Sequence, residues 1–155
     1  MRRIIDKILA IITVSLLVIL VLTCLWQIFS RFVLNSPSKY TEELMRYGLV
    51  WLSLLGAPYA YGRGKHAAMT FLIKKIPNAG QRYMSTLVDF LVAAFAVIVL
   101  IIGGIIVAHN AAGQISSSLG MPMPVFYLFA PVSGLLFLFY VAANIIERFS
   151  AKKEV

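Results

Sequence analysis

Long apolar stretches alternate with short charged segments along this chain, and the longest apolar stretch lies in its second half. Between Asp89 and Glu147 there are 57 residues without a Lys, Arg, Asp or Glu, and Gly and Pro residues interrupt this run near its middle. A helix needs roughly 20 mostly apolar residues to cross a hydrocarbon core of about 30 Å. The run is therefore long enough for two crossings with a turn between them, which predicts an integral membrane protein.

Two further apolar segments precede this run, so the pattern predicts an all-α protein with four transmembrane helices in a single membrane domain. The expected spans are Ile8–Phe29, Leu44–Tyr61, Ser85–Ala112 and Val125–Ile146. The second is the least apolar, because only 16 residues separate Arg46 from Arg63. Glu42 and Glu43 lie in its first turn, where carboxylates offset the positive end of a helix.

The basic residues indicate the direction of these spans. Eleven Lys and Arg residues flank the spans on the side of both termini and of the middle loop, whereas Arg31, Lys39 and Arg46 fall on the opposite side. Because Lys and Arg concentrate on the cytoplasmic side of membrane proteins, both termini are expected in the cytoplasm, and the membrane is a bacterial inner membrane if the chain is bacterial. The net charge of +8 is thus a topology signal, and no nucleic-acid partner is expected.

The middle loop contains a short amphipathic segment at about residues 66–76. Its apolar residues recur at i, i+3, i+4 and i+7: Met69, Leu72, Ile73 and Ile76. Lys65, Lys74 and Lys75 supply positive charge beside this stripe. The pattern predicts a helix lying in the membrane interface, with its lysines toward anionic lipid headgroups. An irregular loop with chance spacing is the alternative.

No recognised catalytic, metal-binding or cofactor-binding motif occurs in the sequence, so an enzyme is not expected. Glu42 and Glu43 are the one carboxylate pair, but neighbours on a helix point about 100° apart. Glu42 instead lies four residues before Arg46, a spacing at which opposite charges pair. These residues are therefore expected to form ion pairs and to begin a helix, not to act as an acid–base dyad.

Two other function classes remain as alternatives. A haem-binding redox subunit would need ligands close together, but His66 and His109 fall near opposite sides of the expected membrane. An autonomous four-helix exporter would need ionisable groups near mid-depth. The middles of the first, third and fourth spans hold no such group, which favours a chain that works through association.

Small residues mark possible contact surfaces on two spans. Gly104, Ala108 and Ala112 follow a small-xxx-small spacing on the third span, and Gly48 and Gly56 lie on the second. Such spacing permits close approach of another helix. Small residues also occur on helices that face lipid, so contact with a partner and contact with lipid both remain open.

Two groups of residues form a pattern that extends over most of the chain. The first group spans the first outer loop and the second span: Arg31-Phe32-Val33-Leu34-Asn35, Glu42-Glu43, Arg46, Trp51, Leu55-Gly56-Ala57, Arg63 and His66. The second lies at the entry to the fourth span: Leu119-Gly120-Met121-Pro122, Tyr127, Pro131 and Gly134. These groups resemble a known family, the small membrane subunit (DctQ-like) of tripartite ATP-independent periplasmic (TRAP) transporters. With the length and the four spans, the resemblance covers nearly the whole chain.

The resemblance implies a division of labour among three partners. A periplasmic binding protein captures a small organic acid, such as a C4-dicarboxylate or sialic acid, and a large transmembrane subunit carries it by a sodium-driven movement. The small subunit would enlarge and immobilise the static scaffold, with membrane lipids holding its basic loop.

Residue roles follow from the resemblance as hypotheses. The expected contact with the large subunit, or support of the first outer loop, comprises Glu42, Glu43, Arg46 and Trp51, and the small residues Gly56, Gly104 and Ala108 extend the expected subunit interface. A capped helix with an ordinary interfacial ion pair is the alternative. Arg31 and Lys39 are expected to contact the binding protein or, alternatively, lipid phosphates.

Overall fold

The computed structural model describes residues 2–36, 38–63 and 78–150, and this part of the chain is helical apart from its turns and one isolated bridge. The predicted all-α class is confirmed. The elements are α1 (Arg2–Phe32), α2 (Lys39–Gly62), α4 (Asn78–Phe95), the π-helix η1 (Ala96–Gly103), α5 (Gly104–Asn110), α6 (Met123–Tyr127) and α7 (Phe129–Ser150). The predicted interfacial segment, residues 66–76, lies outside the described residues.

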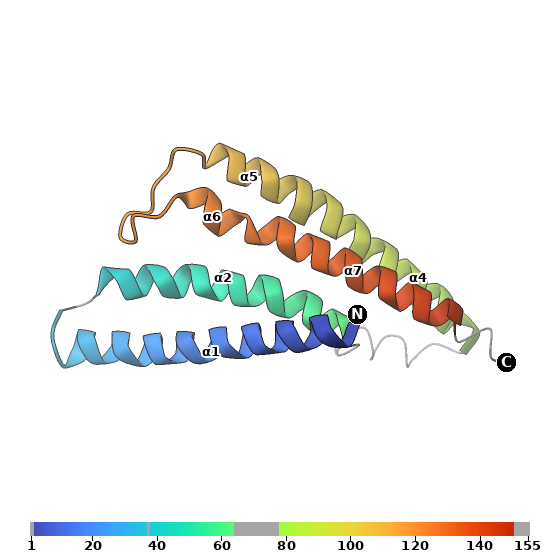
Figure 1. Ribbon diagram of the computed structural model, residues 1–155, viewed down its shortest axis with the longest axis horizontal. Coiled ribbons are helices and arrows are strands. Elements are labelled where there is room, and N and C mark those ends of the chain that lie inside the picture. The colour runs from blue at the N-terminus through green and yellow to red at the C-terminus, as the bar shows by residue number, and fades with distance from the viewer. Residues whose placement is uncertain (1, 37, 64–77, 151–155) are drawn as a thin grey trace.

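The helices lie side by side, with α1 against α2, α2 against α7, and α7 against the long helix formed by α4, η1 and α5 (Figure 1). The start of α1, the end of α2 and the C-terminal part of α7 meet at one end, which we call the terminal end. The linker after α1 and residues 111–122 lie at the other end, which we call the loop end. The chain therefore runs up and down between these two ends.

Three helices of the described part are long and apolar enough to cross a membrane: Arg2–Phe32, Tyr83–Asn110 and Met123–Glu147. They contain the first and fourth expected spans and all but the last two residues of the third, because the helix ends at Asn110 and not at Ala112. The second expected span, Leu44–Tyr61, does form a helix within α2, but α2 is not among the three. The reason lies in its composition, because four charged residues occupy its first two turns and Gly, Ser, Pro and Tyr interrupt the rest.

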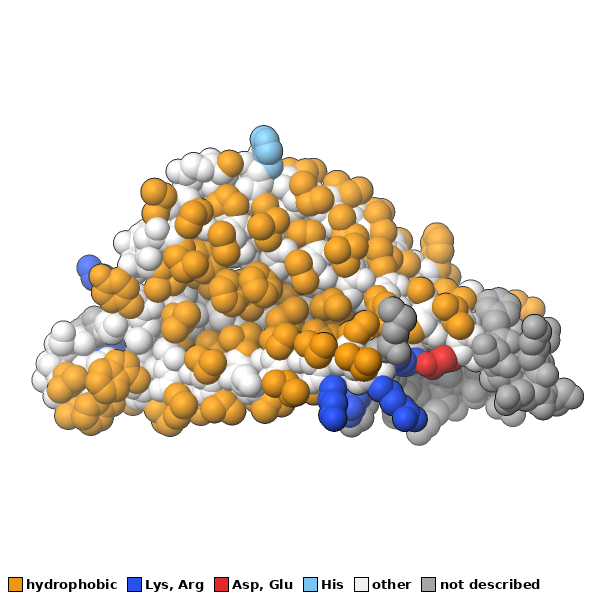
Figure 2. Space-filling model, in the orientation of Figure 1, with side chains coloured by type: hydrophobic (Ala, Val, Ile, Leu, Met, Phe, Trp, Pro, Cys, Tyr) orange, Lys and Arg blue, Asp and Glu red, His pale blue; other side chains and the backbone are white. Residues whose placement is uncertain are grey.

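The apolar surface of the molecule is extensive. In the most apolar 18-residue stretch of α1, only 11% of the residues are buried inside the molecule. The corresponding share for the helix Met123–Glu147 is 39%. Hydrophobic side chains cover most of the face in Figure 2, whereas Lys, Arg and acidic side chains gather mainly at the terminal end. This distribution suits helices surrounded by hydrocarbon, because in lipid an exposed apolar side chain carries no cost.

A hydrogen bond between helices compensates a proline at the centre of the core. Pro58 lies inside α2 and is fully buried, and its ring nitrogen has no hydrogen to donate to the Leu54 carbonyl one turn earlier. The hydroxyl of Ser133 on α7 donates to this carbonyl at 2.5 Å. Ser133 is fully buried as well, so the bond joins α2 to α7 while it satisfies a backbone acceptor away from water.

The π-helix lies in the middle of the third expected span and packs on α7. At Gly134 of α7 a Cβ atom would lie 2.6 Å from the side chain of Ile101 and 3.0 Å from the Ala96 carbonyl oxygen. Only a residue without a side chain fits this approach. The wider turns of a π-helix carry no signal in the apolar pattern, and the sequence predicted an ordinary α-helix here.

Polar side chains tie the helices together at the terminal end. Arg2 forms an ion pair with Glu147, donates to the side chain of Asn144 at 3.1 Å and also donates to the Gly62 carbonyl. The fully buried Tyr140 donates its hydroxyl to Asp6 at 2.5 Å. These bonds connect α1, α2 and α7, so the terminal end is held by side chains of α1 and α7 and by a backbone carbonyl of α2.

Candidate functional site

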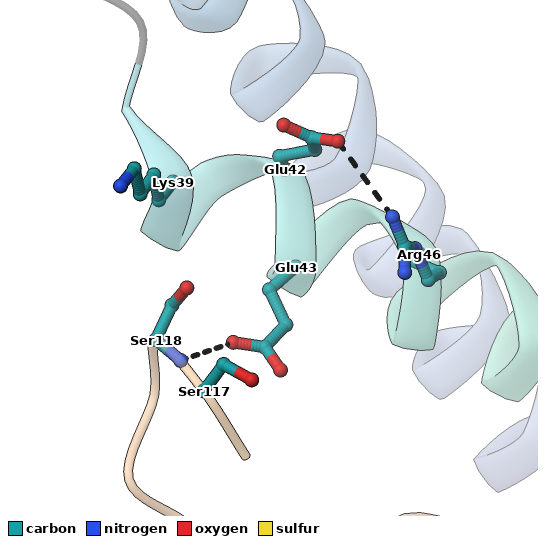
Figure 3. Close-up of a pocket in the computed structure, with 6 residues that line it drawn as sticks. All are labelled: Lys39, Glu42, Glu43, Arg46, Ser117 and Ser118. Carbon is teal, nitrogen blue, oxygen red and sulfur yellow. Dashed lines mark hydrogen bonds and ion pairs between the residues drawn. The ribbon is translucent and has the colours of Figure 1, made fainter.

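A polar pocket of about 320 Å³ opens at the loop end of the described structure, between the first turns of α2 and the linker 111–122. Figure 3 shows its residues: Lys39, Glu42, Glu43, Arg46, Ser117 and Ser118. The pocket thus combines the charged residues that the sequence singled out at the start of the second span with a serine-rich loop that is about 75 residues away in sequence.

Glu43 holds the linker 111–122 against α2. Its carboxylate accepts hydrogen bonds from the Ser116 hydroxyl at 2.6 Å, the Ser118 amide at 2.8 Å and the Leu119 amide at 3.1 Å. The Ser116 bond, followed by the two amide bonds, lowers the pKa of Glu43 below its ordinary value of 4.5, although desolvation acts in the opposite direction. The charged carboxylate is therefore the form that fits the loop.

Backbone hydrogen bonds hold the linker 111–122 in the conformation that makes this contact. The Ser116 amide donates to the Met121 carbonyl at 2.9 Å, and the Gly120 amide donates to the Ser116 carbonyl at 3.2 Å. Gly120 has a φ of +66°, a conformation that favours glycine. The tight turn leaves the amides of Ser118 and Leu119 directed to the carboxylate, so the linker 111–122 is bound to α2.

Glu42 diverges from Glu43, as the sequence predicted. It pairs with Arg46 at 3.6 Å, and both side chains remain largely exposed, at 63% and 71%. Lys39 lies two turns before Arg46 and is also exposed. Figure 3 shows Glu42 and Arg46 on one side of α2 and Glu43 reaching the loop on another. The pocket therefore leaves one carboxylate and two cations available at its rim.

Trp51 contributes to an aromatic stack inside the molecule. Its ring lies 4.4 Å from that of Phe129 and 5.6 Å from that of Phe126, and its indole N–H donates to the Phe126 carbonyl at 3.3 Å. Tyr47 stacks on Phe126 at 4.0 Å, one turn closer to the loop end. The structure thus places Trp51 between α2 and the α6–α7 helix of the same chain.

The small residues of the sequence analysis fall into two groups. A Cβ at Gly104 would lie 2.7 Å from Pro131, and Ala108 is 7% exposed, so both pack within the chain on the α6–α7 side. At Gly56, in contrast, no atom lies within 4 Å of an added Cβ. Of the small residues proposed for a subunit interface, Gly56 is the one that faces open space.

Arg31 ends α1 near the loop end and is exposed, with its guanidinium 6.0 Å from the Phe32 ring. It shares this end of the molecule with Lys39 at the start of α2 (Figure 1). The proposed lipid-anchoring residues Lys65, Lys74 and Lys75 lie outside the described residues.

Two buried polar pairs were missed by the sequence analysis. Asp89 is 3% exposed and accepts a hydrogen bond from the Tyr61 hydroxyl, and Asp6 accepts from Tyr140. In the sequence, Asp89 drew attention as the residue that precedes the charge-free run, although it lies inside the third expected span. Its position there was the available signal, because a carboxylate within a span needs polar partners.

Comparisons with known proteins agree with this description. The family model described as "Tripartite ATP-independent periplasmic transporters, DctQ component" matches residues 19–151. A Haemophilus influenzae protein whose name includes "TRAP transporter small permease protein" is 28% identical over 144 residues, 93% of this chain and 86% of that protein. The expected partners, a large transmembrane subunit and a periplasmic binding protein, are the other parts of such a tripartite system.

Two relatives carry sialic acid in their names. The sialic acid TRAP transporter small permease protein SiaQ of Vibrio cholerae is 37% identical over 102 residues, which cover 64% of this chain and 59% of SiaQ. The sialic acid TRAP transporter permease protein SiaT of Haemophilus influenzae is 31% identical over 114 residues, 73% of this chain but only 18% of SiaT. The aligned region is thus a small part of a much longer permease.

Proposed function

Because the chain belongs to the DctQ component family of tripartite ATP-independent periplasmic transporters, we propose that it serves a sodium-coupled transporter of small organic acids as its scaffolding small subunit. A component of such a transporter is not an enzyme. The observation that carries the proposal is the family match over residues 19–151, joined to a set of mostly exposed apolar helices. Sialic acid, named for two relatives, is the first substrate to test, followed by C4-dicarboxylates.

The proposal includes four crossings with both termini in the cytoplasm of a bacterial inner membrane. Three helices are apolar enough to cross by themselves, and α2 packs between α1 and α7, which cover one side of it. The up-and-down order of the helices and the excess of Lys and Arg on the side of the termini support this orientation.

The proposed role is mechanical. A carrier domain that slides through a membrane needs a partner that stays fixed, and a wider fixed body resists tilting. Extensive apolar surface on α1 and on the long α4–η1–α5 helix provides this width. Lys65, Lys74 and Lys75 would add an electrostatic anchor to anionic lipid.

The loop end is the proposed side for the periplasmic binding protein. Arg31 and Lys39 are exposed there, and the linker 111–122 is fixed by Glu43. A rigid end with two free cations suits contact with acidic side chains of a soluble partner. Contact with lipid phosphates is the competing use of the same charges.

Reconstitution of all three components in liposomes tests this function. Uptake of labelled sialic acid is expected only when this chain, the large subunit, the binding protein and an inward sodium gradient are all present. Reversal of both charges in Arg31→Glu, Lys39→Glu is expected to raise the concentration of binding protein needed for half-maximal uptake. Uptake without this chain would refute the scaffold role, and an unchanged dependence on binding protein would assign the two cations to lipid.

A further inference from the structure

One side of α2 is exposed or half-buried along its length in the described structure. Its residues follow one another at alternating steps of four and three positions, and we call them the α2 seam: Glu42, Arg46, Leu49, Ser53, Gly56 and Ala60. Leu49 is 52% exposed, Ser53 is exposed, and the space at Gly56 is open. Steps of four and three keep residues on one side of a helix, so the seam is a continuous strip along α2.

The opposite side of α2 packs against other helices of the same chain. Gly48 packs against Leu20 of α1, with an added Cβ only 2.5 Å from that side chain. Trp51 stacks on Phe129, and Leu55 and Pro58 belong to the buried core. Since α1 and α7 both lie on this side, the α2 seam faces away from the rest of the described molecule.

The α2 seam is poorly suited to lipid. It carries an exposed ion pair at one end, a serine in the middle and small residues beyond, and α2 is the one long helix of the described part that is not apolar enough to cross a membrane alone. The exposed side of α1, by comparison, consists mainly of Ile, Leu and Val. A strip with so little apolar area in a membrane-embedded helix indicates cover by protein.

We infer that the α2 seam is the docking site for one transmembrane helix of the large subunit, an inference that rests on the proposed function. Alternating steps of four and three residues are those of helices that cross at about 20° with interlocking side chains. Ser53 and Gly56 leave room for large apolar side chains of the partner near mid-depth, and Ala60 does so near the terminal end. Glu42 and Arg46 offer hydrogen bonds to polar groups of the partner near the surface.

The comparison with SiaT supports this occupant. The region similar to this chain forms 18% of that permease, so in SiaT it is covalently part of the same polypeptide as a large permease. A lasting contact through a helix face fits this arrangement better than a transient encounter does. The partner that we infer for the α2 seam is therefore a helix of the large subunit and not a second copy of this chain.

Co-purification with the large subunit tests the inference. Ser53→Leu and Gly56→Leu fill the α2 seam, and each is expected to lower the amount of large subunit recovered with the tagged chain by about tenfold, because overfilled contacts cost enough free energy for such a change. Gly103→Leu is the matched control, since only the Ile98 carbonyl lies within 4 Å of its added Cβ, at 3.6 Å. It is expected to change recovery less than about twofold.

A photo-cross-linking amino acid at position 53 gives a second readout that does not depend on weakened binding. An adduct with the large subunit supports the inference, whereas an adduct with a second copy of the chain, or with lipid alone, overturns it. If the wild-type chain brings down no large subunit, the proposed function fails. If the wild type and both seam variants bring down equal amounts, the function stands and the docking site lies elsewhere.

Discussion

The two N-terminal helices lie side by side, yet they are built for different surroundings. α1 is mainly apolar between its charged first two turns and Arg31, has few buried residues and lies at the edge of the molecule. α2 is more polar and packs between α1 and α7. Its Glu43 also accepts the hydrogen bond from Ser116 that holds the linker 111–122. The difference indicates that a helix surrounded by hydrocarbon needs only apolar side chains, whereas a helix surrounded by protein needs specific ones.

The two tryptophans test this comparison most directly, because one lies on each helix. Trp51→Ala removes the stack on Phe126 and Phe129 and the bond to the Phe126 carbonyl, and it is expected to lower the free energy of unfolding by about 3 kcal/mol. Trp26→Ala on α1 is the matched control. Trp26 is 53% exposed and makes one tilted contact with Phe29 at 6.0 Å, so less than about 1 kcal/mol is expected.

Unfolding titrations with sodium dodecyl sulfate in mixed micelles measure both variants. Equal losses for Trp51→Ala and Trp26→Ala would show that α1 depends on specific packing as much as α2 does.

The bond between Ser133 and the Leu54 carbonyl gives the next largest effect. Ser133→Ala leaves a buried acceptor without this donor and is expected to cost about 1–3 kcal/mol of stability. In a Pro58→Ala background the residue at position 58 regains a backbone N–H for Leu54, so Ser133→Ala is expected to cost less there. A double-mutant cycle measures this coupling. An equal cost in both backgrounds would show that the bond from Ser133 does not compensate for Pro58.

Glu43 makes the loop end sensitive to acid. Because the pKa of Glu43 is lowered in the folded chain, its bonds stabilise the loop fully above the ordinary value of 4.5 and are lost as the pH falls through the lower, folded value. Glu43→Gln is expected to speed hydrogen exchange at the Ser118 and Leu119 amides severalfold at neutral pH. Exchange rates at these amides that match the wild type would remove Glu43 from loop docking, and Glu42→Gln is the control.

The smallest effect is expected from the exposed ion pair of α2. Glu42 and Arg46 are 3.6 Å apart and largely exposed, so Glu42→Gln is expected to change the stability of the isolated subunit by less than about 0.5 kcal/mol. A loss above 1 kcal/mol in the same detergent titration would assign the pair a structural role within the chain. A small loss in isolation combined with weaker recovery of the large subunit would place the pair in the α2 seam.

The sequence was enough to predict the helical class, the three most apolar spans and the divergence of Glu42 from Glu43. These features depend on apolar content and on helical spacing, which are local properties of the chain. The same local reasoning located the start of α2 but treated its helix as a span like the others, because composition alone does not show which neighbours shield its polar residues.

The partner of each polar or small residue could be seen only in the folded structure. Ser133 beside Pro58, Glu43 beside the serine loop and Tyr140 beside Asp6 join residues that are 73 to 134 positions apart, and no local pattern encodes such distances. Gly104 and Gly56 have the same side chain, yet one is covered by α7 and the other faces open space. The packing of neighbouring helices makes that difference, because it fixes which side of each helix remains free.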